Sequence, residues 1–217
     1  MTLPLRLIAS SACILLLAVA AANAQQSLNQ EVAISKIEAT FLDTPKVQAG
    51  GFSKRSSGRP GSWLEVEVTF EHAPNPRLPQ TADELTVNYY VLLKNEAFTL
   101  DRKPTMLSGK VAHIHVPAGK ALHSSIYVPP RVLENFFGGK MPVNAAQAIT
   151  DVGVTITGKD GLLAISTMRG TVKGDKGWWD NADQFTTVAG RLYNKDQTPF
   201  ASLEWDFYEL IKPATTN

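Results

Sequence analysis

The stretch Trp63-Leu64-Glu65-Val66-Glu67-Val68-Thr69-Phe70 decides the fold class of this chain. Apolar residues occupy every second position from Leu64 to Phe70, which places their side chains on one face. Glu65, Glu67 and Thr69 take the opposite face. A period of two is that of a β-strand, and one apolar and one polar face are typical of a half-buried antiparallel sheet. We interpret Glu65 and Glu67 as solvated side chains of the polar face.

Comparable patterns predict strands along most of the chain. Leu85–Leu93 also carries Tyr90 and Leu92 on its second face and is predicted as a central strand. Further strands are predicted at Ile34–Phe41, Met106–Val116, Leu122–Val128, Val152–Ile156, Leu162–Met168, Val188–Tyr193 and Leu203–Phe207. Turn-forming residues stand at 117–119, 158–161 and 194–196. This all-β pattern of about eight or nine short strands predicts a single immunoglobulin-like β-sandwich of antiparallel strands, with an open barrel as the alternative.

One short helix is predicted at Pro130–Phe137. Proline suits a first helical turn, and Gly138 and Gly139 provide a stop signal. We expect this helix to close one end of the sandwich. Two loops rich in turn-forming residues, Gly50–Gly61 and Ala73–Ala82, are expected to be exposed.

The first 24 residues have the features of a cleaved secretory signal peptide. Arg6 precedes an apolar run, and Ala22-Asn23-Ala24 forms a small-x-small cleavage box. Cleavage would remove Cys13, the single cysteine, and leave a chain without thiols for disulfides or thiolate chemistry. We therefore expect one domain over residues 25–212, a flexible tail at 213–217 and no membrane anchor. The expected location is the periplasm, the outer membrane or the cell surface.

The charge balance argues against nucleic acid as a partner. The chain has 21 basic and 20 acidic residues, and loss of Arg6 with the signal peptide would make them equal. Nucleic-acid binding normally needs an excess of clustered positive charge.

Three histidines suggest one candidate site. A hairpin turning at Ala118–Lys120 would put His113, His115 and His123 on one outward polar face, and three imidazoles can bind a transition metal. No carboxylate in this hairpin completes a ligand shell. We therefore favour a solvated polar face and predict no metal.

The segment Trp178-Trp179-Asp180-Asn181-Ala182-Asp183 is the second candidate. Tryptophan rings can stack on sugars or contact partner proteins. The oxygens of Asp180, Asn181 and Asp183 could hold calcium, but their spacing lacks the alternate-residue pattern of a calcium loop. The alternative is that one of the two rings is buried at the end of the core. Residues Trp178, Trp179, Asp180 and Asp183 form the predicted ligand or partner contact.

No catalytic motif accompanies these candidates. The chain contains neither a Gly-x-Ser-x-Gly nucleophile elbow nor a His-Glu-x-x-His zinc motif. We predict no catalytic residues and no cofactor, and we expect the protein not to be an enzyme.

Several sequence segments resemble those of a known family: Ile34–Phe41, Trp63–Val68, Leu85–Tyr90, Gly177-Trp178-Trp179 and Thr198–Asp206. Together they resemble the immunoglobulin-like exported proteins of the type IV pilus-associated gene cluster of Akkermansia and related Verrucomicrobia. The resemblance implies an envelope or surface protein without established enzyme activity, and it transfers no site residues. The chain lacks the long apolar helix that follows the processing site of a true pilin. It is therefore expected to be an accessory component rather than the filament subunit.

The sequence thus predicts a non-enzymatic structural or interaction protein of a type IV pilus-like system. Its expected partners are envelope or pilus-associated proteins, and an exposed strand edge could accept another chain. Homo-oligomerisation is left open. The alternative function is a glycan-binding module or adhesin that uses Trp178 and Trp179.

Overall fold

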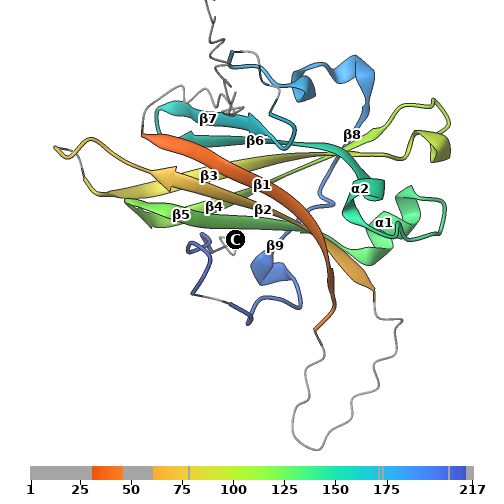
Figure 1. Ribbon diagram of the computed structural model, residues 1–217, viewed down its shortest axis with the longest axis horizontal. Coiled ribbons are helices and arrows are strands. Elements are labelled where there is room, and N and C mark those ends of the chain that lie inside the picture. The colour runs from red at the N-terminus through yellow and green to blue at the C-terminus, as the bar shows by residue number, and fades with distance from the viewer. Residues whose placement is uncertain are drawn as a thin grey trace, which may run out of the picture.

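The alternating segments pair into two β-sheets that face each other in the computed structural model (Figure 1). The structure describes residues 31–45, 61–77, 79–170, 172, 174–204 and 206–213. The strands are β1 (Val32–Asp43), β2 (Ser62–His72), β3 (Thr81–Leu93), β4 (Thr105–Pro117), β5 (Gly119–Val128), β6 (Ile149–Gly158), β7 (Gly161–Thr167), β8 (Thr186–Ala189) and β9 (Tyr193–Asn194). The predicted all-β sandwich is confirmed.

The strand order is that of an immunoglobulin-like sandwich. The four-stranded sheet has the order β1-β2-β5-β9, and the five-stranded sheet has the order β7-β6-β3-β4-β8. Strands β1, β2 and β5 take the places of immunoglobulin strands A, B and E, and β3, β6 and β7 those of C, F and G. Strand β4 adds beside β3 in the position of strand C′. The turn after β4 therefore carries the chain from one sheet to the other.

The core lies between the sheets and is built by the alternation seen in the sequence. Leu64, Val66, Val68 and Phe70 of β2 have no exposed surface, and the inward residues of β3 and β6 pack against them. Burying such side chains is the main favourable contribution to folding, on the order of 1.5–3 kcal/mol each. The predicted double-sided strand Leu85–Leu93 is indeed central, because β3 pairs with both β4 and β6.

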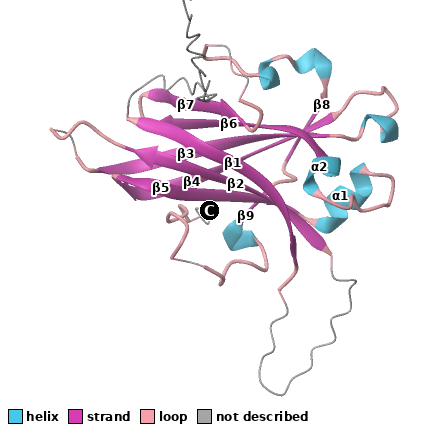
Figure 2. Ribbon diagram, viewed as in Figure 1, coloured by secondary structure: helices cyan, strands magenta, loops and turns pink. Residues whose placement is uncertain are grey.

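Two short α-helices lie at one end of the sandwich (Figure 2). Helix α1 (Pro130–Phe136) begins with proline and is followed by Gly138 and Gly139 at positive φ, as predicted, and its Leu133 is fully buried. Helix α2 (Ala145–Ala148) was not predicted. Its first turn is capped by Asn144, whose side-chain oxygen accepts a hydrogen bond from the backbone N–H of Gln147.

Two predicted strands near the C-terminus differ from the structure. Val188–Tyr193 divides into β8 and β9, and β8 pairs in parallel with β4, so the pairing is not wholly antiparallel. The prediction of a strand at Leu203–Phe207 is wrong. There the backbone makes turn hydrogen bonds, from Leu203 N–H to the Phe200 carbonyl and from Phe207 N–H to the Glu204 carbonyl. These local bonds favour folding the segment back on itself rather than extending it along a sheet edge.

The described residues between 172 and 213, here called the C-terminal arm, cover both outer faces of the sandwich. Trp179 packs on Tyr90 of the five-stranded sheet, whereas Phe200 packs on Tyr127 of the four-stranded sheet. Figure 1 shows this blue segment passing from one side of the sandwich to the other. Near its end, Ile211 forms a bridge with His113 of β4, and the Glu209 N–H donates to the His123 carbonyl of β5. The arm thereby ties the two sheets together.

Some predictions lie outside the described residues. These are the signal peptide at 1–24, nearly all of the loop Gly50–Gly61 and most of the tail at 213–217. Within the described part of the chain, none of the helices is long and apolar enough to cross a membrane.

Candidate functional site

The candidate site lies on the outer face of the four-stranded sheet, where β2 and β5 present polar side chains. The register places Glu65 opposite Tyr127 and Glu67 opposite Ser125. Residues opposite each other in an antiparallel pair have their Cβ atoms about 5 Å apart, so these side chains meet on one face. The site follows directly from the alternation of Trp63–Phe70, whose polar half provides both carboxylates.

The C-terminal arm covers this face and leaves a cavity of about 570 Å³ beneath it. The lining residues come from the end of β1, from β2 and β5, and from the arm: Leu42, Asp43, Pro45, Glu65, Glu67, Tyr127, Lys195, Phe200, Leu203, Glu204, Phe207 and Tyr208. Glu65, which we predicted to be solvated, is only 8% exposed. The cause is the arm, which contacts the sheet from far along the chain and which strand periodicity does not reveal.

Two tyrosines hold the carboxylates in place. The Tyr127 hydroxyl donates to Oε1 of Glu65 across 2.6 Å. The Tyr208 hydroxyl lies 3.3 Å from the same oxygen and 3.1 Å from Oε2 of Glu67, so its single proton is shared between the two carboxylates. Ser125 donates to the Tyr127 hydroxyl across 3.2 Å. The hydroxyl network therefore joins both carboxylates into one unit.

Aromatic rings form much of the rest of the site. Phe200 stacks on Tyr127 with ring centroids 5.3 Å apart, and Phe207 stacks on His123 at 3.9 Å. The Nδ1 atom of His123 is 3.1 Å from Oε1 of Glu67. Lys195 donates from Nζ to the Leu203 carbonyl, and the same ammonium lies 4.8 Å from the centroid of the Tyr208 ring. The lysine is thus held by the arm itself.

Burial shifts the ionisation of this cluster. Burial raises the pKa of Glu65, and the negative charges of Glu67 and Glu204 raise it further, against the opposing effect of the tyrosine hydrogen bonds. Burial also raises the pKa of Tyr208, and the two carboxylates beside it add to that rise. Burial lowers the pKa of Lys195. The acidic side chains of the lining outnumber its single lysine, so the cavity is acidic, and several of its walls are aromatic.

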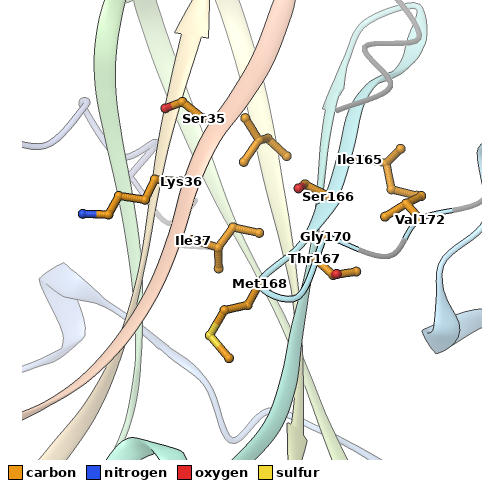
Figure 3. A pocket seen from close by; sticks show the side chains of 10 residues that line it. Ser35, Lys36, Ile37, Ile165, Ser166, Thr167, Met168, Gly170 and Val172 are labelled. Atoms are coloured by element: carbon orange, nitrogen blue, oxygen red, sulfur yellow. The ribbon is translucent and has the colours of Figure 1, made fainter. Parts of the chain in front are cut away.

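A second concave feature lies at the seam where the edge strands of the two sheets meet. A groove of about 240 Å³ runs between β1 and β7 and is lined by residues 34–37, residues 165–168, Gly170 and Val172. Figure 3 shows Ile37 and Met168 between the two strands, with Lys36 pointing away from them. Among the described residues, β1 forms a ladder only with β2, and β7 only with β6. Within the part of the chain that the structure describes, no ladder joins the facing edges of these two strands.

The predicted tryptophan contact lies on the opposite side of the sandwich. Trp179 is 8% exposed and stacks on Tyr90, with ring centroids 4.7 Å apart and planes at 2°. Trp178 is half-buried and packs edge-on against Trp179 and Phe185. Asp180 is exposed and accepts a hydrogen bond from the Gly177 N–H, and Asp183 is also exposed. A ligand contact at these four residues stays a prediction, but the Trp179 ring itself is buried in a small outer core.

The three histidines do not share one face, which corrects the predicted hairpin. Strands β4 and β5 belong to different sheets, so the imidazoles diverge. His113 is 1% exposed and points into the sandwich, where Nε2 lies 2.7 Å from the Ser124 hydroxyl. His115 is exposed at a φ of 54°, and His123 belongs to the cavity face. The described residues contain no cluster of three or more potential ligands that could hold a metal ion.

Fold and site together define the class: an immunoglobulin-like β-sandwich whose C-terminal arm encloses an acidic, aromatic cavity on one outer face. A protein-family model matches residues 22–215, and the chain belongs to this family. It is also similar to a protein from Akkermansia muciniphila of known crystal structure, with a TM-score of 0.68 and 23% identity over 85% of this chain and 94% of that chain. That likeness shows the shared fold. No curated protein matches this chain.

Proposed function

We propose that this is an exported, non-enzymatic protein of the cell envelope that binds another polypeptide as an accessory component of a type IV pilus-like system. Two observations support an envelope role: the N-terminal signal-peptide pattern and the resemblance to pilus-cluster proteins of Akkermansia. The observation that carries the binding role is the seam between β1 and β7, where two strand edges lie side by side and do not pair within the described part of the chain.

An unpaired edge can bind an extended segment by adding it as a further strand. Backbone hydrogen bonds then supply affinity, and side-chain pockets along the groove supply specificity. The seam offers both kinds of contact. Within the described residues no ladder joins the facing edges of β1 and β7, and apolar side chains such as Ile37 and Met168 line the groove between them.

The edge also carries features that limit unwanted pairing. The register of β1 shifts between Ile34 and Lys36, and Lys36 forms an exposed ion pair with Glu38 at 2.7 Å. Bulges and charged residues are common means of protecting an edge from non-specific association. An edge protected in this way fits a selective partner better than indiscriminate self-assembly.

The test is crosslinking in intact cells, followed by purification and mass spectrometry. Ile37→Arg and Ser166→Arg would fill the seam from its two sides (Figure 3), and Thr187→Arg, on an exposed position of β8 away from the groove and the cavity, is the matched control. We expect envelope or pilus components to be recovered with the wild type and the control and to be lost with both seam variants. Thermal unfolding should first show that all variants fold.

Recovery of the same partners with the seam variants would refute the edge as the binding surface. Recovery of cytoplasmic proteins alone, or unchanged pili after deletion of the gene, would refute the envelope role.

A further inference from the structure

The cavity beneath the C-terminal arm has an exposed aromatic side chain at its rim. Phe207 is 46% exposed although one face of its ring stacks on His123. It lines the main cavity and also a neighbouring hollow of about 410 Å³, which it shares with Glu204 and Asp206. The exposed part of this phenyl ring lies between two hollows and is accessible to a binding partner.

The charges that surround this ring are unbalanced. Four of the lining residues of the cavity are acidic, Asp43, Glu65, Glu67 and Glu204, and one is a lysine. Lys195 is already engaged with the Leu203 carbonyl and the Tyr208 ring. His123 faces Glu67 from the neighbouring strand and offers at most one further positive charge. The cavity therefore remains complementary to a cation.

One of these carboxylates, Glu65, is also held in a setting that disfavours its charge. Glu65 is nearly buried, and Glu67 and Glu204 lie close enough to disfavour its ionised form. Burying carboxylates beside one another costs stability unless a positive charge compensates them. Such a cost is typical of a binding site whose ligand supplies the missing charge.

We propose that this cavity binds a lysine or arginine side chain that an extended segment of a partner protein presents. The carboxylates of Glu67 and Glu204 would pair with the ammonium or guanidinium group, and Phe207 would contact it through its ring face. The inference rests on the proposed function for the nature of the partner, since it assumes a protein segment. It names the chemistry of that partner at a second surface, separate from the β1–β7 seam.

The test uses short peptides that differ in one charge. Acetyl-Gly-Arg-Gly-amide is compared with its citrulline analogue, and the lysine peptide with its acetyl-lysine analogue. Binding to the full protein is followed by NMR signals of the His123, Tyr208 and Phe207 side chains. We expect saturable shifts with the charged peptides at about millimolar concentration and none with the neutral analogues.

Variants localise the binding. Glu67→Gln should weaken it about tenfold, and Phe207→Ala about twofold to fivefold. Asp160→Asn, which removes an exposed carboxylate in the turn between β6 and β7 of the other sheet, is the matched control and should leave binding unchanged. Equal binding of the citrulline peptide, binding unaffected by Glu67→Gln, or no binding at all would each overturn the inference.

The two proposals can fail separately. If the charged peptides do not bind but the seam variants still lose their partner, the cavity inference falls and the proposed function stands. If the peptides bind at the cavity and no envelope partner is recovered from cells, the proposed function falls and the site for a cationic side chain stands.

Discussion

The two outer faces of the sandwich are covered by the same C-terminal arm in opposite ways. On the five-stranded sheet, Trp179 stacks flat on Tyr90 and joins Met106, Ile165 and Phe185 in a small apolar cluster. On the four-stranded sheet, the arm covers carboxylates and tyrosine hydroxyls and leaves a cavity. The first covering is a well-packed apolar contact, whereas the second encloses groups that would prefer water.

A glycine shows how close the first contact is. Gly153 of β6 lies under the Trp179 ring, and a Cβ at this position would come within 2.0 Å of a ring carbon. On the other face Phe200 is buried against Tyr127, but Leu203 and Phe207 remain 43% and 46% exposed. The comparison indicates that one half of the arm stabilises the fold and that the other half forms a site.

The largest expected effect is on the apolar face. Trp179→Ala should lower the free energy of unfolding by about 3–5 kcal/mol, because it removes a large buried ring and leaves a void over Gly153. Leu203→Ala, in the half of the arm over the cavity, should cost less than about 1 kcal/mol, because that side chain is already partly in water. Urea unfolding of both variants measures the difference. Equal losses would contradict the division of the arm into a structural and a binding half.

The second largest effect on stability concerns His113, which is buried in the interior of the sandwich next to the end of the C-terminal arm. Burial lowers the pKa of His113 to about 4, although hydrogen bonding to the backbone at Glu209 opposes this shift. Between about pH 6.5 and pH 4 the unfolded chain therefore binds a proton that the folded protein does not. The contribution of neutral His113 to stability is complete above this window. It should fall by up to about 3 kcal/mol as the pH drops through the window.

His113→Gln isolates this contribution. Burial raises the pKa values of Glu65, Asp151 and Glu209, which adds stability on acidification, so wild type and variant must be compared at each pH. The wild type should lose its advantage over the variant between pH 7 and pH 4 in urea unfolding. A constant difference would mean that His113 does not remain neutral in the folded protein.

The strands were predictable from sequence because their alternation is local. β2 and β3 follow the predicted faces closely, and the turn at 158–161 joins β6 to β7 as expected. The partner of a strand is not local information. A tight turn after β4 is compatible with a hairpin or with a crossing between sheets. The prediction of a hairpin wrongly placed the three histidines on one face, because β4 and β5 belong to different sheets.

The cavity could be predicted only in part. The alternation of Trp63–Phe70 correctly placed Glu65 and Glu67 on the outer face, but their burial depends on Tyr208, more than 140 positions along the chain. The alternation around Leu203 suggested a strand, although these residues fold back over the sheet. Periodicity reports which side chains share a face, and it does not report which distant segment covers that face.

The smallest expected effect has the opposite sign. Glu65→Gln should raise the free energy of unfolding at pH 7 by about 0.5–1 kcal/mol, because it removes a buried charge and keeps an oxygen that accepts from Tyr127. Because the pKa of Glu65 is raised, the wild type gains stability as the pH falls, and the advantage of the variant should shrink by pH 5. Asp160→Asn, at an exposed carboxylate of the turn between β6 and β7, is the control. Destabilisation by Glu65→Gln at pH 7 would show that the ionised carboxylate supports the fold, so that both outer faces serve stability.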